Sequence, residues 1–160
     1  MTTTQFSPST SPENYNGTAY VAGPMSGIKA ANFPAFIAAD HWLRDNGWST
    51  FNPAVHELER GIVPEEILDM SEDFFTELAE LGFEFDKSHA LRRDMNAIAD
   101  ADSIILLEGW ETSSGATLEL RAAVWTNKNV HLLYKHTEGE YTLQTVDGPR
   151  LIELLGESHE

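Results

Sequence analysis

The alternation of apolar and polar residues along the chain predicts strands and helices in turn. Short apolar runs bounded by glycine, proline or asparagine are typical of buried strands. We expect strands at residues 18–23, 48–51, 103–107 and 129–134, and an alternating segment at 140–146 that adds a fifth strand at an edge of the sheet.

Between these strands the apolar residues recur at helical spacing. The pattern predicts helices over residues 32–46, 88–100, 116–126 and 151–155. The first begins with Asn32 as its N-cap or at an earlier turn, and Ser88 can cap the second. Strands that alternate with helices indicate an α/β fold. We therefore predict a single doubly wound, Rossmann-like domain whose mainly parallel sheet of about five strands is flanked by helices.

The two remaining segments do not follow this alternation of strand and helix patterns. Residues 1–17 are rich in Ser, Thr, Pro and Asn, which predicts a flexible N-terminal tail before a domain at 18–160. Residues 54–87 have apolar positions of mixed period, and Pro64 suits the first turn of a helix there. We expect an insertion of one or two helices over the top of the sheet, as either a lid or a packing layer.

Charge and composition narrow the classes of partner. The chain has 26 acidic and 10 basic residues and a net charge of −16, which opposes binding to nucleic acid polymers and to anionic membranes. No apolar run is long enough to span a bilayer, and the first residues do not read as a signal peptide. The chain has no cysteine, and we expect a cytoplasmic protein.

The loop after the first strand is the first candidate site. It contains Gly23, Met25, Ser26 and Gly27. The two glycines allow close approach of the backbone and Ser26 offers a hydroxyl, so the loop can cradle a phosphate or a sugar. It matches neither the dinucleotide-binding fingerprint nor a P-loop, and for the loop taken alone a tight strand-to-helix turn is the better explanation.

The loop after the third predicted strand is the second candidate site. It contains Gly109, Trp110, Ser114 and Gly115. Ligands of open α/β sheets bind at the carboxyl ends of the strands, and we expect Glu119 there in the first turn of the following helix. A glutamate in a first turn is also common because it suits the helix dipole. Trp110 can stack on a planar ring or simply pack, and Asp94 on the preceding helix is by default a solvated residue.

Taken together, these motifs resemble the nucleoside 2-deoxyribosyltransferase-like superfamily. The resemblance covers roughly residues 18–134, and it is closest to the small phage and bacterial branch, with similarity to the 2′-deoxynucleoside 5′-phosphate N-hydrolases. It rests on Gly-Pro-Met-Ser-Gly at 23–27, Asn-Phe-Pro at 32–34, Arg-Asp at 93–94, Gly-Trp-Glu at 109–111 and Ser-Gly-Ala-Thr-Leu-Glu at 114–119.

The resemblance implies a role for each matching residue. Glu119 would be the nucleophile, Asp94 would assist the leaving base, and Tyr20 would position the nucleophile or the sugar. The 23–27 loop would hold a 5′-phosphate, although Lys29 is the only cation close to it and Arg92 and Arg93 are more distant. Members of the superfamily usually pair so that one subunit completes the other's site, which implies a homodimer.

The implied reaction is cleavage or transfer of the N-glycosidic bond of a (deoxy)nucleoside or nucleoside 5′-monophosphate. A carboxylate below the sugar stabilises the positive charge that grows at C1′ and can trap it as an ester. Asp94 and Glu119 should then lie about one sugar ring apart, on the order of 5–9 Å. We expect no metal and no cofactor, since the six histidines lack metal-ligand spacing. Two other hypotheses remain: a non-catalytic nucleotide-binding sensor or sponge on the same fold, and a domain that only binds partner proteins.

Overall fold

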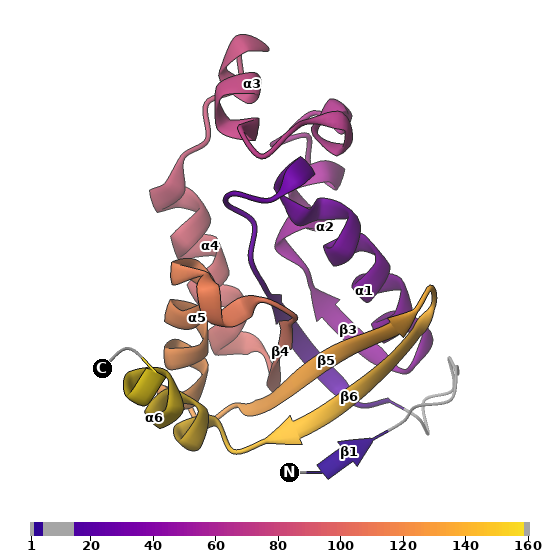
Figure 1. The fold of residues 1–160 in the computed structure, drawn as a ribbon, viewed down its shortest axis with the longest axis vertical. Helices are drawn as coiled ribbons and strands as arrows, with labels where there is room; N and C mark the ends of the chain where they lie inside the picture. The colour runs from indigo at the N-terminus through magenta and orange to yellow at the C-terminus, as the bar shows by residue number, and fades with distance from the viewer. Residues whose placement is uncertain (1, 5–14, 159–160) are drawn as a thin grey trace.

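A sheet of mixed direction forms the centre of the molecule (Figure 1). The computed structural model describes residues 2–4 and 15–158, and in that part of the chain the sheet has six strands in the order β1-β6-β5-β4-β2-β3. The strands are β1 (Thr2–Thr4), β2 (Gly17–Ala22), β3 (Trp48–Phe51), β4 (Ser103–Leu107), β5 (Asn129–Thr137) and β6 (Glu140–Val146). Strands β3, β2, β4 and β5 are parallel, whereas β6 runs antiparallel to both of its neighbours.

Helices cover both faces of this sheet, which confirms the predicted doubly wound, Rossmann-like α/β domain. The α-helices are α1 (Phe33–Asp45), α2 (Pro53–Glu59), α3 (Phe74–Glu80), α4 (Lys87–Asp100), α5 (Ser114–Trp125) and α6 (Gly148–Ser158). Short 3-10 helices are η2 (Lys29–Asn32), η3 (Glu65–Asp69) and η4 (Trp110–Thr112). In the described residues no helix is long and apolar enough to cross a membrane.

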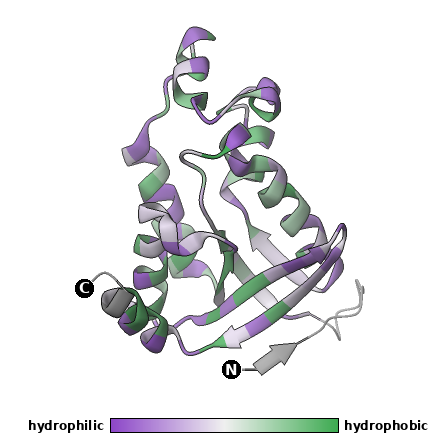
Figure 2. Cartoon of the chain, in the orientation of Figure 1, coloured by the Kyte–Doolittle hydropathy of each residue, from purple (hydrophilic) through white to green (hydrophobic). Residues whose placement is uncertain are grey.

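The alternating side chains of the strands divide the core into two layers. Val21 and Ile105 point to one layer, where they pack with Phe33 and Phe36 of α1. Tyr20 and the residues next to Ile105 point to the other layer, which α4, α5 and α6 cover. All five residues of β4 are buried, as expected for a central parallel strand. The tip of the β5–β6 hairpin is hydrophilic (Figure 2).

The predicted N-terminal tail and edge strand need correction. Thr2–Thr4 pair antiparallel with β6, so these three residues belong to the sheet and β6 is not at its edge. Gly17 already begins β2. Residues 5–14 of the predicted tail lie outside the described residues.

Helix boundaries differ from the predictions by small but informative amounts. Asp86 rather than Ser88 caps α4, since its carboxylate accepts from the His89 amide at 3.1 Å. Ser113 caps α5 by accepting from the Ala116 amide at 3.1 Å. Because α5 begins at Ser114, Glu119 lies in its second turn and not in its first. Glu119 is therefore not explained by a favourable position beside the helix dipole.

The segment at 54–87 contains more structure than predicted. Helix α2 begins at Pro53, after Asn52 accepts from the Val55 amide at 3.3 Å, and η3 and α3 follow it. Its apolar residues join the core under α1, including Ile67 and Phe74. The segment rises beyond the ends of β2 and β4 (Figure 1), so it is a packing layer that also stands over the carboxyl ends of the strands.

Candidate functional site

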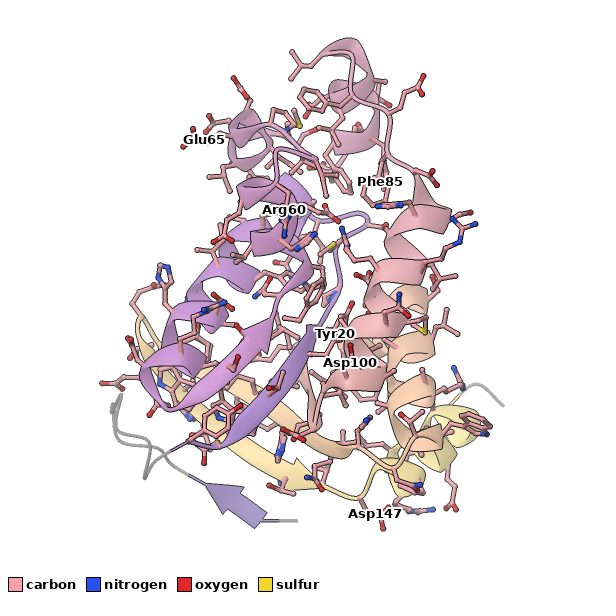
Figure 3. The ribbon with its side chains drawn as sticks, turned by 180° about the vertical axis from the view of Figure 1, so that it is seen from behind. Tyr20, Arg60, Glu65, Phe85, Asp100 and Asp147 are labelled. Carbon is pink, nitrogen blue, oxygen red and sulfur yellow. The ribbon has the colours of Figure 1, made fainter. Side chains whose placement is uncertain are left out.

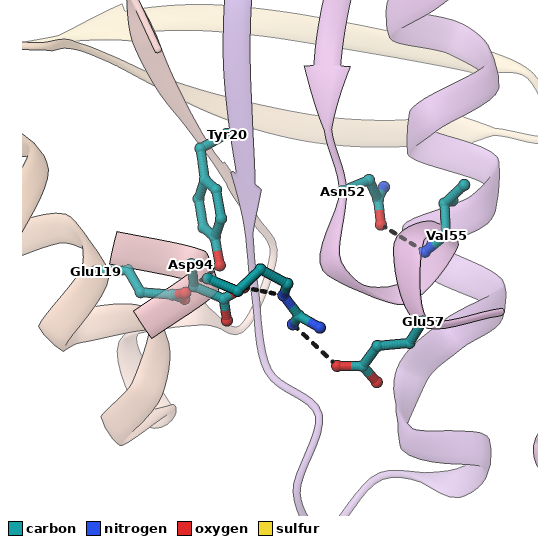
Figure 4. A network of polar contacts seen from close by, with 7 residues as sticks. Tyr20, Asn52, Val55, Glu57, Asp94 and Glu119 are labelled. Carbon is teal, nitrogen blue, oxygen red and sulfur yellow. Dashed lines mark hydrogen bonds and ion pairs between the residues drawn. The ribbon is translucent and has the colours of Figure 1, made fainter. Parts of the chain in front are cut away.

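Tyr20 lies at the centre of the candidate site. Its ring is completely buried and stacks on Phe51, its partner in β3, with 5.8 Å between the ring centroids. Its hydroxyl donates a hydrogen bond to Glu119 Oε2, and it also lies beside the carboxyl group of Asp94 (Figure 4). A strand and two helices thus bring one phenol and two carboxyl groups together, as predicted for Tyr20, Asp94 and Glu119.

Burial changes the proton affinity of all three groups. It raises the pKa of Glu119 to about 8; the Tyr20 hydrogen bond opposes this shift and the charge of Asp94 adds to it. Burial also raises the pKa of Asp94, although the bond from Arg93 acts to lower it. The pKa of Tyr20 is raised well above its ordinary value, first by burial and then by the two carboxylates. The two carboxyl groups consequently retain protons to a higher pH than exposed acids do.

Arg93 connects this cluster to a third acid. Its Nε donates to Asp94 Oδ1 at 2.9 Å and its Nη2 donates to Glu57 Oε1 at 3.1 Å. Burial works to lower the pKa of Arg93, but the bonds to Asp94 and Glu57 outweigh this and raise it. The guanidinium carbon also lies 5.9 Å from the centre of the Phe51 ring. Arg93 therefore stays charged and fixes the orientation of Asp94.

Glu57 is a member of this buried cluster that sequence reasoning did not find. It lies on α2 with only 4% of its surface exposed, and burial raises its pKa while Arg93 lowers it. The signal was present in Asn52-Pro53, an N-cap followed by proline at the first helical position. Recognising that helix would have placed Glu57 one turn from its start, on the side that faces the core.

A pocket of about 650 Å³ opens above this cluster at the carboxyl ends of the strands. Tyr20, Asp94, Glu119 and Glu57 are among its lining residues. Of the predicted binding residues, it is lined by Gly23, Met25, Ser26, Gly27, Ser114 and Gly115. The volume lies within the range that small-molecule sites occupy.

Gly109 and Trp110 are not part of this pocket. Trp110 is only 9% exposed and packs in the core layer under α5, so its ring is not free to stack on a ligand there. Gly109 has a φ of +87° and lies against Pro24, so a Cβ added to this glycine would come within 3.1 Å of the proline ring. These two residues shape the loop and do not line the site.

The two glycines of the first loop serve different purposes. A Cβ on Gly23 would come within 2.9 Å of Leu107 Cβ, so this glycine permits close packing of the loop on β4. Gly27 has a φ of +78° with open space around it, which is a backbone requirement of the turn. Ser26 and Gly27 are both exposed at the pocket.

The candidate cations do not gather at that loop. Arg93 is bound to Glu57 and Asp94, and Arg92 is exposed. Lys29 lines a second cavity, between α1 and the β5–β6 hairpin, that does not include the carboxylate cluster. Within residues 2–4 and 15–158 no three His, Asp or Glu side chains gather in the way a metal ion requires.

Comparison with known proteins gives a family without an assigned activity. A family model described as a domain of unknown function, DUF4406, matches residues 18–132, which is well over half of the chain. The chain belongs to the DUF4406 family. No curated protein matches it significantly. The matched region of this DUF4406 member begins at β2 and contains Tyr20, Glu57, Arg93, Asp94 and Glu119.

Proposed function

We propose that this DUF4406 protein cleaves or transfers the N-glycosidic bond of a (deoxy)nucleoside or nucleoside 5′-monophosphate, with Glu119 as nucleophile. The observation that carries the proposal is the Tyr20 hydroxyl, which lies between the carboxyl groups of Glu119 and Asp94 at the base of the pocket. The resemblance to the nucleoside 2-deoxyribosyltransferase-like superfamily, where these residues match the catalytic set, supports it.

The proposed reaction has two steps that balance. The ionised Glu119 carboxylate bonds to C1′ while the C1′–N bond breaks, and the base leaves with the bonding electrons and takes a proton from Asp94. Water then attacks C1′, frees Glu119 and returns a proton to Asp94, or a second base takes the sugar. Tyr20 orients Glu119 through its hydroxyl, and Arg93 holds Asp94 in place.

Release of free base tests the proposal. The protein is incubated with deoxynucleosides, ribonucleosides and their 5′-monophosphates, and chromatography measures the base. The wild type should release base from at least one of them, and Glu119→Ala should release none. Absence of release over the whole panel, or equal release by the variant, would contradict the proposal.

A second candidate function is nucleotide binding without turnover, as a sensor or sponge. It is favoured by one observation: burial raises the pKa of Glu119 to about 8, so the free protein holds this nucleophile largely protonated at neutral pH. A thermal-shift screen separates the two functions, because a pure binder is stabilised by a nucleoside that it leaves intact.

We also propose that the protein is a homodimer that pairs through α4 and α5. Apolar side chains are exposed on these helices: Leu91 at 46%, Leu118 at 48% and Trp125 at 86%. Leu91 and Leu118 also line the pocket, so a second copy seated there would complete its rim. Sedimentation of the wild type should give a dimer and Trp125→Lys a monomer; a wild-type monomer at micromolar concentration would contradict this.

A further inference from the structure

The pocket has two chemically different ends. Its base holds the carboxyl groups of Asp94, Glu119 and Glu57. The rest of its wall is largely apolar, and its largest side chains are Phe33, Phe36, Ile67, Phe74, Phe75 and Phe85. A sugar placed on Glu119 occupies only the polar end, so the apolar end must receive another part of the ligand.

The apolar end lies on the same side as Asp94. Ala90 and Leu91 line the pocket one turn before Asp94 on α4, and Phe85 lines it just before that helix begins. Figure 3 shows Phe85 at the junction of α3 and α4, well beyond the end of the strand that carries Tyr20. Because Asp94 is the residue proposed to contact the leaving base, this wall would meet the leaving group rather than the sugar.

Phe75 is the aromatic ring most available to such a group. Its ring centroid lies 4.3 Å from that of Phe74 and 5.8 Å from that of Phe85, yet 42% of its surface remains exposed. A ring held by two neighbours and exposed at a pocket offers an apolar contact surface that costs little conformational entropy on binding.

The charges around the pocket disfavour a phosphate. Among the described residues that line it, Glu57, Asp94 and Glu119 are acidic and Lys87 is the single cation. The guanidinium of Arg93 already binds two of these carboxylates. A dianion would therefore enter a site with net negative charge.

We infer that the substrate is a nucleoside-like N-glycoside without a phosphate, whose leaving group is a base with a large, uncharged, apolar substituent. This inference rests on the proposed function and names its substrate class. The sugar lies over Glu119, the base contacts Asp94, and the substituent packs against Phe75, Phe74 and Phe85.

Four probes test the inference: 2′-deoxyadenosine, N6-benzyl-2′-deoxyadenosine and the 5′-monophosphate of each. Base release by the wild type gives kcat/KM, and calorimetry with Glu119→Gln gives Kd. Compared with the plain nucleoside, the benzyl nucleoside should have a kcat/KM at least tenfold higher and a Kd at least tenfold lower. Each 5′-phosphate should lower kcat/KM and raise Kd at least tenfold. Phe75→Ser should remove most of the benzyl preference, whereas Leu81→Ser, an exposed α3-end residue outside the pocket lining, should keep it.

The outcomes separate the inference from the function on which it rests. Glu119-dependent release that shows no benzyl preference, or that improves with phosphate, overturns the inference and leaves the proposed function standing. Benzyl-selective binding that Phe75→Ser weakens, without base release from any probe or from the wider panel of nucleosides and monophosphates, supports the apolar recognition site and overturns the proposed function.

Discussion

At the residue scale, the site is recognisable because it is unfavourable for stability. Glu119 lies in the second turn of α5, away from the positions where a helix dipole or cap would favour an acid. It is nevertheless placed beside a second buried carboxyl group, where burial raises its pKa to about 8. Proteins keep such arrangements mainly where they serve chemistry.

The cost of burying Glu119 should be measurable as a change of the protein's stability with pH. The folded-state pKa of Glu119 is raised from 4.5 to about 8, so between these values the unfolded chain has lost a proton that the folded protein keeps. The contribution of the Glu119 carboxyl group to the free energy of unfolding is complete below pH 4.5 and is lost as pH rises towards 8. The melting temperature of Glu119→Gln should match the wild type near pH 5 and exceed it increasingly up to about pH 8. The exposed Glu111→Gln is the control, and a difference that does not change with pH would show that Glu119 ionises freely.

Glu57 should act through Arg93 as a positioning residue. Replacing it with Gln removes one of the two carboxylates that hold the guanidinium, and we expect a loss of about 2 kcal/mol in the free energy of unfolding in urea. The negative charge of Glu57 also favours the protonated form of Asp94. Without this charge Asp94 loses its proton at lower pH, so the alkaline limb of the pH profile of base release should move to lower pH. Glu59→Gln, on the exposed side of α2, should stay within about 0.5 kcal/mol with an unchanged pH profile. An unchanged profile in Glu57→Gln would show that Glu57 supports only the fold.

Sequence reasoning found the residues that carry recognisable motifs, named Arg93 only as a distant cation, and missed Glu57. Tyr20, Asp94 and Glu119 were predicted and are brought together, because motif positions at strand ends are set by the topology. Arg93 and Glu57 form a contact across 36 residues, and no local pattern indicates it. Trp110 was predicted to line the binding site, whereas its burial depends on how α5 packs over the loop.

At the element scale, the turn that leads into α1 is under strain. Ala30, Ala31 and Asn32 all have left-handed backbones, with φ of 54°, 52° and 62°. Ala31 lines the site pocket, and the Asn32 side chain donates to the Pro24 carbonyl at 2.9 Å. The predicted N-cap at Asn32 is correct in position, but its side chain bonds to the first loop and does not cap the helix.

Glycine substitutions should reveal this strain. Ala39→Gly in α1 should cost about 2 kcal/mol, from lower helix propensity and a lost buried methyl group. Ala30→Gly loses a similarly buried methyl group, but it also removes the strain of a left-handed alanine, which costs about 1–2 kcal/mol. The free energy of unfolding of Ala30→Gly should therefore stay within about 0.5 kcal/mol of the wild-type value. Urea denaturation measures both. Equal losses in the two variants would mean that the turn is unstrained.

At the scale of the whole molecule, the fold was predictable because the strand and helix periods are clear. The central strands and the α4 and α5 helices follow directly from buried runs and helical spacing. The pairing of Thr2–Thr4 with β6 was not predictable, since a strand of three polar residues has no periodic signal. Its partner strand also lies about 140 residues away along the chain, with Thr3 opposite Gln144. The mixed periods of residues 54–87 reflect short helical pieces that divide their apolar residues between the core and the pocket.

The assembled sheet also predicts how the molecule responds to acid. His131 of β5 lies between the hydroxyls of Thr145 and Ser103, and burial lowers its pKa from 6.5 to about 4. Below pH 6.5 His131 takes up a proton in the unfolded chain but not in the folded protein. The free energy of unfolding therefore falls by on the order of 3 kcal/mol as pH drops towards 4. His131→Gln should flatten the stability curve in this window, and the exposed His89→Gln should not. Parallel curves for wild type and His131→Gln would contradict the assignment.

In the proposed mechanism the Glu119 carboxylate bonds to the sugar, and intact-mass spectrometry can detect this bond. The protein is incubated with a nucleoside whose 2′-fluoro substituent slows breakdown of a glycosyl ester, and the labelled protein is digested with pepsin. We expect a single sugar adduct on the peptide that contains Glu119, absent from Glu119→Gln and discharged by added free base. An adduct on another residue, or base release from this nucleoside by Glu119→Gln at the wild-type rate, would contradict it.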